Sequence, residues 1–251
     1  MNFCLLLHLF TKMLVMNFGV VVFPGSNCDD DVVHVLGDVL KQSVKKLWHK
    51  DTDLGGLTTD DCIVLPGGFS YGDYLRSGAV ARFSPIMQHV IEFANNGGVV
   101  WGICNGFQIL CESGLLPGAL LRNENQRFIC KNLFIKPITN NSAITAGVGL
   151  DNNLKIPIAH ADGRYFAPED TLQSLIDNDQ ILFKYCDAKG EIKPESNPNG
   201  SIENIAGICN AKRNVFGMMP HPERAAEKIL GNTDGKLLFE SLLNYAKATL
   251  A

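Results

Sequence analysis

The sequence lacks three features that would each assign it to a common class. Its 22 Lys and Arg residues, against 26 Asp and Glu, form no basic stripe, which argues against nucleic-acid binding. Past the first residues, no apolar run approaches the length that crosses a membrane. No Gly-rich P-loop is present to hold the phosphates of a nucleotide. What remains is a chain of 251 residues with 46% hydrophobic side chains, enough for one domain with a full core.

The cysteines follow no pattern that binds a metal or builds a disulfide framework. Several lie within apolar runs, which is typical of inert buried thiols. We therefore expect a reducing compartment, by default the cytoplasm, and no metal site. The eight cysteines are scattered, without a Cys-x-x-Cys pair: Cys4, Cys28, Cys62, Cys104, Cys111, Cys130, Cys186 and Cys209.

The first 15 residues stand apart from the pattern that follows. The run from Cys4 to Phe10 is apolar, but no basic residue precedes it and no small-residue cleavage site follows it, unlike a signal peptide. Met13 and Met16 come next, and a regular strand pattern begins at Phe18. We expect residues 1–15 to be an N-terminal extension or a mis-assigned start rather than a targeting segment, and residues 16–251 to form a single domain.

Strand and helix patterns alternate through the first 115 residues. The continuous apolar run at 18–23 predicts a strand that is covered on both faces, and further strands are expected within 61–68 and at 99–103. Helical spacing predicts helices over 29–41 and after Ser84, which is the expected N-cap. The alternation predicts an α/β fold with an open, mostly parallel sheet and helices on both faces. The second half is less regular, with strands expected near 132–138, 155–160, 180–187 and 206–210 and a final helix over about 234–250.

One corner of the chain carries a thiol between two glycines. In "VVWGICNGFQIL", a strand pattern ends at Gly102-Ile-Cys104-Asn-Gly106 and a helical pattern follows at once. This is the layout of a nucleophile elbow, in which the glycines permit a sharp turn that holds the side chain over the sheet. The helix N-terminus behind Cys104 would lower the thiol pKa and offer N–H groups to an oxyanion. The alternative is a buried cysteine whose neighbouring glycines only ease packing.

A cysteine nucleophile needs a base, and the base needs an orienting group. Of the six histidines, His221 is the best candidate, because it follows an apolar strand in "MMPHPERAA" and has a proline on each side. In extended backbone, residues i and i+2 face the same way, so Glu223 can fix the imidazole. The alternative is a rigid turn into the last helix.

A glycine pair follows another predicted strand. In "LPGGFSYGDYLRSGA", Gly67 and Gly68 leave backbone N–H groups free and allow a substrate to approach the main chain. A glycine cluster alone is weak evidence and could be only a flexible loop. The glycine pair, the Cys104 corner and the His-x-Glu segment together are far more specific than any one of them.

These three segments resemble the class I (triad) glutamine amidotransferases, which have a flavodoxin-like α/β architecture. Longer stretches, such as "VLPGGFSYGDYLRSGAVARF" and "NPNGSIENIAGICN", narrow the resemblance to the glutaminase subunits that serve purine biosynthesis. The resemblance covers the chain from about Phe18 to its C-terminus. It implies that Cys104 attacks the side-chain amide of glutamine, with His221 as general base and acid and Glu223 orienting it. It further implies an oxyanion hole formed by the Gly67-Gly68 loop and the Asn105 backbone N–H, with Gln108 near the substrate.

The same resemblance implies partners. The released ammonia would pass to a large synthetase subunit that uses ATP and Mg to convert formylglycinamide ribonucleotide to its amidine, and a small third subunit would bridge the two. No cofactor is expected in this chain. The chain departs from the family pattern at "HADG" (160–163), where the family more often has "HGEG", so the role of Asp162 stays open. It also has Ser77 where cysteine is common.

Two alternatives from other classes compete with this interpretation. A stand-alone cysteine hydrolase or chaperone-like protein could share the cysteine corner, but it would need neither the Pro-His-Pro-Glu segment nor the "GGFSYGD" loop. A binding or regulatory module could carry an inactive triad, but all three triad residues are present. The sequence therefore favours the glutaminase.

Overall fold

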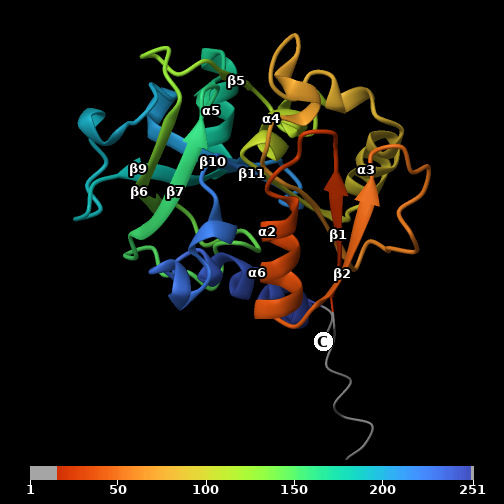
Figure 1. The fold of residues 1–251 in the computed structure, drawn as a ribbon. Helices are drawn as coiled ribbons and strands as arrows, with labels where there is room; N and C mark the ends of the chain where they lie inside the picture. The colour runs from red at the N-terminus through yellow and green to blue at the C-terminus, as the bar shows by residue number, and fades with distance from the viewer. Residues whose placement is uncertain (1–15, 250–251) are drawn as a thin grey trace, which may run out of the picture.

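The computed structural model describes residues 16–249, so the expected extension at residues 1–15 lies outside the described part (Figure 1). Its main element is a nine-stranded sheet with the order β2-β1-β3-β4-β11-β10-β9-β6-β7. A separate two-stranded sheet pairs β5 (Ala119–Leu121) with β8 (Arg164–Phe166). The large sheet therefore divides into two halves that meet at β11.

The first half is parallel, as the sequence predicts. Each neighbouring pair from β2 through β1, β3 and β4 to β11 runs in the same direction. Because β3 and β4 are almost wholly buried, they read as continuous apolar runs rather than as alternating ones. The strands of this half are β1 (Asn17–Val22), β2 (Ser43–Trp48), β3 (Cys62–Leu65), β4 (Val99–Ile103) and β11 (Val215–Met218).

The second half is antiparallel and lies on the other side of Figure 1, in green and blue. The predicted strands near 132–138, 155–160, 180–187 and 206–210 all form in this half. The open, mostly parallel α/β class is confirmed, and the antiparallel extension is the part that the sequence did not specify. Its strands are β6 (Ile129–Pro137), β7 (Leu154–His160), β9 (Ile181–Cys186) and β10 (Ile205–Cys209).

The helices also match, with one exception. α2 (Asp29–His34) gives way to a π-helical turn over Val35–Val39, where the sequence predicts one helix over 29–41. The Leu40 N–H bonds to the Val35 carbonyl five residues back. The spacing of the apolar residues does not distinguish this hydrogen-bond pattern from the ordinary one. The other helices are α3 (Pro85–Asn95), α4 (Asn105–Glu112), α5 (Glu169–Asp177) and α6 (Lys236–Thr249).

Helices cover both faces of the sheet at β4. The Trp101 ring packs against Phe239 of α6, with ring centroids 4.7 Å apart. Gly102, which must point to the opposite face, lies against Gly106 and Leu110 of α4. The close approach of α4 to the sheet fixes the corner between β4 and α4.

We expect Gly106→Ala to destabilise this corner strongly. A Cβ at Gly106 would lie 1.9 Å from the Leu65 carbonyl oxygen, a backbone atom of β3 that cannot move alone. The expected loss is about 3 kcal/mol of unfolding free energy, measured by denaturant titration. The matched control is Gly37→Ala, whose Cβ would meet only Val44 at 3.8 Å. Equal stability of the two variants would contradict the packing described for α4.

Candidate active site

The carboxyl ends of three adjacent parallel strands bring the predicted site residues together. Gly67 and Gly68 follow β3, Cys104 follows β4 and His221 follows β11. The backbone N–H of Cys104 bonds to the Met218 carbonyl at 2.8 Å, which ties the corner to the end of β11. Functional residues are expected at this edge of a parallel sheet.

Cys104 has the backbone of a nucleophile elbow. Its φ of 50° and ψ of −105° lie outside the regions that a cysteine ordinarily adopts. Such strain costs about 1–3 kcal/mol and persists only where the surrounding structure enforces it. Cys104 is also the N-cap of α4, so the thiol stands at the positive end of the helix. Its Sγ lies 3.8 Å from the Ala159 carbonyl oxygen of β7.

His221 and Glu223 form a buried pair. The imidazole Nδ1 lies 2.6 Å from Glu223 Oε1, and both side chains are almost inaccessible to solvent. The sequence predicts this pair from extended backbone, whereas the segment is a 3₁₀ turn over Pro222–Ala225. The turn brings the two side chains together because His221 is its N-cap and Glu223 belongs to its first turn.

The charge of this pair favours an imidazolium. Burial alone would lower the pKa of His221, but the Glu223 carboxylate and the nearby Cys104 and Cys28 thiols raise it well above its ordinary value. The Nε2 atom is buried and has no hydrogen-bond partner of good geometry among the described residues. It is therefore free to exchange a proton with a reacting group.

The glycine pair lies directly against the imidazole. A Cβ at Gly67 would be 2.6 Å from the His221 Cε1 atom, so no other residue fits there. Gly68 has a φ of 141° and packs on the backbone of Asn27. Within residues 16–249, neither N–H of the pair makes a hydrogen bond. Two backbone donors are thus available beside His221, as an oxyanion hole requires.

Asn105 and Gln108 connect the loops around Cys104. Asn105 is fully buried, accepts a hydrogen bond from the Ser70 N–H at 3.1 Å and donates one to Gln108 Oε1 at 2.8 Å. The Gln108 Nε2 donates to the Asp162 carbonyl at 2.5 Å. Both ends of the Gln108 amide are therefore used within the protein. Gln108 therefore holds the loop at Asp162 in position.

A pair of carboxylates borders this network. The Ser77 hydroxyl donates to Asp162 at 3.0 Å and also lies close to Asp73. Burial raises the pKa of Asp73 to about 6; the Ser77 hydroxyl opposes this shift and the charge of Asp162 adds to it. Asp73 has a φ of 54°, in the left-handed region, so the loop holds its carboxyl in place at a backbone cost.

We expect Asp73→Asn to stabilise the protein above pH 6. The folded pKa of about 6 exceeds the unfolded value, so the folded state binds more protons between about pH 4 and 6, and stability falls across this window as pH rises. Asparagine removes that cost, which is about 1 kcal/mol once solvent screening of this partly exposed group is counted. Melting curves of both proteins at pH 4 and pH 7.5 measure it. A constant difference at both pH values would contradict the assignment.

Asn123, which no sequence signal marked, holds the segment 160–163 in place. Asn123 is fully buried, and its Oδ1 lies 3.0 Å from His160 Nδ1 and 3.1 Å from the Gly163 N–H. Burial, helped by the charge of His221, lowers the pKa of His160 to about 3, so this imidazole stays neutral. Asn123 lies in a polar stretch, "RNENQR", that carried no sequence signal for a buried asparagine.

Cys28 and Arg224 are two further residues at the site. Cys28 lies at the turn after β1, and its N–H bonds to the Gly67 carbonyl at 3.3 Å. Arg224 donates from one nitrogen to Cys28 Sγ at 3.0 Å and from another to Asp31 at 3.1 Å. No pattern in the sequence linked these two residues, because their contact joins segments that lie far apart in the chain. By contrast, burial raises the pKa of the Cys62 and Cys186 thiols, which agrees with their predicted inertness.

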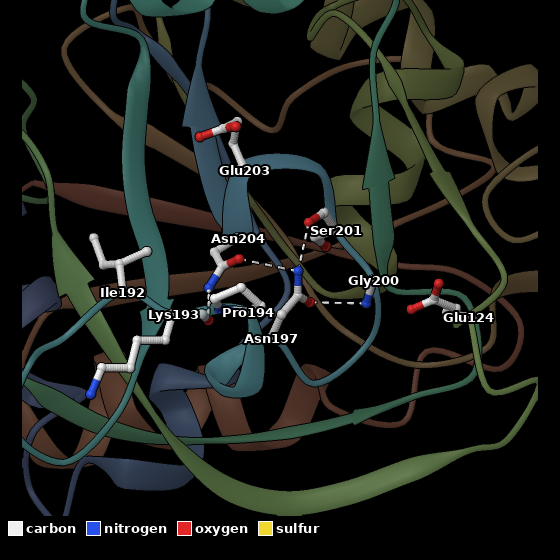
Figure 2. Close-up of a pocket in the computed structure, with 9 residues that line it drawn as sticks. All are labelled: Glu124, Ile192, Lys193, Pro194, Asn197, Gly200, Ser201, Glu203 and Asn204. Atoms are coloured by element: carbon white, nitrogen blue, oxygen red, sulfur yellow. Dashed lines mark hydrogen bonds between the residues drawn. The ribbon is translucent and has the colours of Figure 1, made fainter.

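A separate cavity lies on the antiparallel half (Figure 2). Its volume is about 420 Å³, and it contains none of the predicted site residues. Asn197 organises it by accepting a hydrogen bond from the Gly200 N–H at 2.9 Å and donating to the Ser201 carbonyl at 2.7 Å (Figure 2). The neighbouring Asn199 donates to the Gly163 carbonyl at 2.8 Å. The loop that contains Asn197 and Asn199 therefore also supports the segment 160–163. The cavity is lined by Glu124, Ile192, Lys193, Pro194, Asn197, Gly200, Ser201, Glu203 and Asn204.

Comparison with protein families agrees with this geometry. Residues 16–243 match the model of the CobB/CobQ-like glutamine amidotransferase domain. The match therefore covers nearly all of the described chain and includes every predicted site residue. Within residues 16–249, no helix is long and apolar enough to cross a membrane.

Individual relatives match over almost their full length. The chain is 57% identical over 228 residues to phosphoribosylformylglycinamidine synthase subunit PurQ of Koribacter versatilis, covering 91% of this chain and 97% of that protein. It is 53% identical over 234 residues to the PurQ subunit of Salinibacter ruber, covering 93% and 98%. Among solved structures, a chain of PurLQS from Thermotoga maritima matches with a TM-score of 0.80 and 41% identity, covering 92% and 99%. The glutaminase domain of Trypanosoma brucei CTPS, 13% identical with a TM-score of 0.58, shares the fold.

Proposed function

Because the chain belongs to the CobB/CobQ-like glutamine amidotransferase family, and within it to the PurQ subunits of phosphoribosylformylglycinamidine synthase, we propose that it hydrolyses glutamine through a Cys104-His221-Glu223 triad. The observation that carries this proposal is the strained backbone of Cys104 at the end of β4, beside the buried His221-Glu223 pair. The ammonia released by this hydrolysis is used by an ATP-dependent synthetase, which makes formylglycinamidine ribonucleotide in purine biosynthesis. No cofactor is needed in this chain, since ATP and Mg act in the partner.

Acylation begins at the thiol. Cys104 transfers its proton to His221, which produces the imidazolium that the Glu223 carboxylate favours. The thiolate attacks the Cδ carbonyl of glutamine, which forms a C–S bond and pushes electrons onto the carbonyl oxygen. The N–H groups of Gly67, Gly68 and Asn105 would donate to that oxyanion. The His221 imidazolium then gives its proton to the departing nitrogen, and ammonia leaves as the C–N bond breaks.

Deacylation uses the same groups in reverse. His221, now neutral, accepts a proton from a water molecule that attacks the γ-glutamyl thioester. Collapse of the second tetrahedral species breaks the C–S bond, and the proton on His221 returns to the thiol. Glu223 holds the imidazole through Nδ1 in both steps, at the 2.6 Å separation seen in the structure.

We also propose that the triad works fully only in the complex. A glutaminase that turned over alone would waste glutamine, and the sequence contains no Gly-rich P-loop for the ATP that drives the synthesis. The partners implied by PurQ and PurLQS relatives are a large synthetase subunit and a small bridging subunit. The test is glutamate release by the chain alone and with both partners, formylglycinamide ribonucleotide and ATP. We expect release to rise on assembly; equal turnover in both cases would contradict the coupling.

The loop after the glycine pair is the proposed docking surface for the synthetase. Tyr74 and Leu75 are 77% and 91% exposed, and the Phe69 ring lies tilted against the exposed Phe128 ring, with ring centroids 6.3 Å apart. Leu75 has a φ of 71°, so the loop holds this apolar side chain outward at a backbone cost. Exposed apolar clusters of this kind mark interaction sites. Docking here would set the synthetase beside the oxyanion loop, where ammonia leaves.

We expect Leu75→Asp to weaken the complex without unfolding the chain. Burying a carboxylate in an apolar contact would lower the affinity for the synthetase by about 10-fold or more. The matched control is Ile229→Asp, since Ile229 is 90% exposed on another element. Analytical ultracentrifugation or interferometry with the purified synthetase measures the affinity. Equal affinity of both variants would remove this loop from the interface.

The compartment follows from the thiol chemistry. Cys104 can attack only as a reduced thiol. The described cysteines are all free, and four besides Cys104 are buried. We therefore propose that the chain acts in the cytoplasm.

A further inference from the structure

A second thiol lies against the catalytic imidazole and is not used by the proposed mechanism. Cys28 Sγ, an imidazole nitrogen of His221 and a carboxylate oxygen of Glu223 lie within 4.8 Å of one another, and all three side chains are buried. Cys28 is 2% exposed, as are His221 and Glu223. The cluster joins the turn after β1 to the turn after β11, which are 193 residues apart. Sequence spacing could not reveal it.

Two polar atoms of the cluster are buried without partners. His221 Nε2 and Glu223 Oε2 make no hydrogen bond among the described residues. A buried polar atom without a partner costs free energy, so a cation that engages Glu223 Oε2 would stabilise the site, while His221 Nε2 lies on the other side of the ring from Glu223. The cluster therefore contains polar atoms that form no hydrogen bond within the described residues.

The donor set is that of a zinc ligand shell. Thiolate, imidazole and carboxylate are the three ligand types that Zn²⁺ prefers, and the 4.8 Å limit allows one ion to reach all three donors. Arg224 donates to Cys28 Sγ at 3.0 Å and is itself held by Asp31 at 3.1 Å. Hydrogen bonds of this kind orient ligands in metal sites.

We propose that Cys28, His221 and Glu223 form a site for a thiophilic divalent cation, with Zn²⁺ as the fitting ion, and that its occupation inhibits the glutaminase. A cation held by both His221 and Glu223 replaces the Nδ1 proton that Glu223 accepts, and its charge lowers the basicity of Nε2, the atom that must accept the Cys104 proton. It also removes Glu223 as the group that orients the ring. Binding does not depend on the proposed function; the inhibition does, since it acts on the same base. The cysteine pattern of the sequence does not predict a metal site, and the proposed mechanism does not require a metal.

The direct test is binding of the metal alone to the full chain. Competition with a chromophoric chelator should show one Zn²⁺ per chain, and Co²⁺ should give a thiolate-to-metal absorption band. Cys28→Ser should abolish that band and weaken Zn²⁺ binding by on the order of 100-fold. Two controls separate this site from other thiols: Cys130→Ser, which removes an exposed cysteine, and Cys104→Ala should both retain the band and the affinity.

Inhibition is measured in the assembled synthetase. Zn²⁺ should suppress glutamate release and a chelator should restore it. In Cys28→Ser, with the rate expressed relative to that variant's own metal-free rate, the inhibitory concentration should shift upward by the same factor as the binding. Binding that survives Cys28→Ser, or that is lost in Cys104→Ala or Cys130→Ser instead, would overturn the proposed ligands. Binding at the three residues without inhibition would overturn the regulatory claim. An inactive chain that still shows the Cys28-dependent band would refute the glutaminase and leave the metal site standing.

Discussion

Cys104→Ala is expected to abolish glutamine-dependent synthesis, lowering turnover by on the order of 10⁶-fold. The Cys104 sulfur forms the C–S bond in the proposed mechanism, and alanine offers no atom that can form it. The fold should survive, because alanine keeps the Cβ that the strained backbone already accommodates at φ 50°. Steady-state glutamate release by the assembled complex measures the loss, and circular dichroism checks the fold.

Added ammonium salts provide the control for this variant. A synthetase that receives ammonia from solution bypasses the thiol, so the complex with Cys104→Ala should still make amidine from ammonium. Retention of both reactions would show that Cys104 is not the nucleophile. Loss of both would show that the variant disrupts the complex rather than the chemistry.

Glu223→Gln is expected to lower turnover by on the order of 10⁴-fold. The amide keeps the shape of the side chain but cannot accept the Nδ1–H bond with a negative charge. Because the carboxylate opposes the effect of burial and raises the pKa of His221, its removal lowers that pKa. Less imidazolium is then present at neutral pH to protonate the departing ammonia. Stopped assays of glutamate release from pH 5 to 9 measure both effects.

The pH profile separates this role from a structural one. The high-pH limb of kcat/KM should move to lower pH in Glu223→Gln, which a merely loosened turn would not cause. Glu240→Gln is the matched control, since Glu240 pairs with Lys236 on the surface of α6. A large drop in rate with an unshifted profile would argue against charge as the contribution of Glu223.

The parallel half of the fold was predictable because its signals are local. Buried strands such as β3 and β4 read as apolar runs, and the glycines around Cys104 mark the corner. In the antiparallel half the strands were predictable but their pairing was not, because the pairing of β6 with both β7 and β9 depends on contacts far apart in sequence. The π-helical turn after α2 was also missed, since apolar spacing does not distinguish it from an α-helical turn.

The site divides in the same way. His221 and Glu223 are two residues apart, so their pairing was predictable even though the backbone is a 3₁₀ turn rather than extended. Cys28, Arg224 and Asn123 contribute through contacts between distant segments, and polar sequence around Asn123 hides its burial. Gly67, by contrast, was predictable. Because it follows a strand, the sequence predicted close approach to its backbone, and the His221 imidazole lies against it.

The proposed mechanism requires a covalent intermediate at one thiol. Mass spectrometry of the acid-quenched complex tests for this intermediate most directly. Glutamine is mixed with the assembled synthetase, the reaction is stopped during turnover, and the chain is digested and mapped. We predict one γ-glutamyl group on the peptide that carries Cys104, and none in Cys104→Ala. A modified Cys28, or turnover with no adduct on any cysteine even in a variant slowed at deacylation, would contradict the triad proposed here.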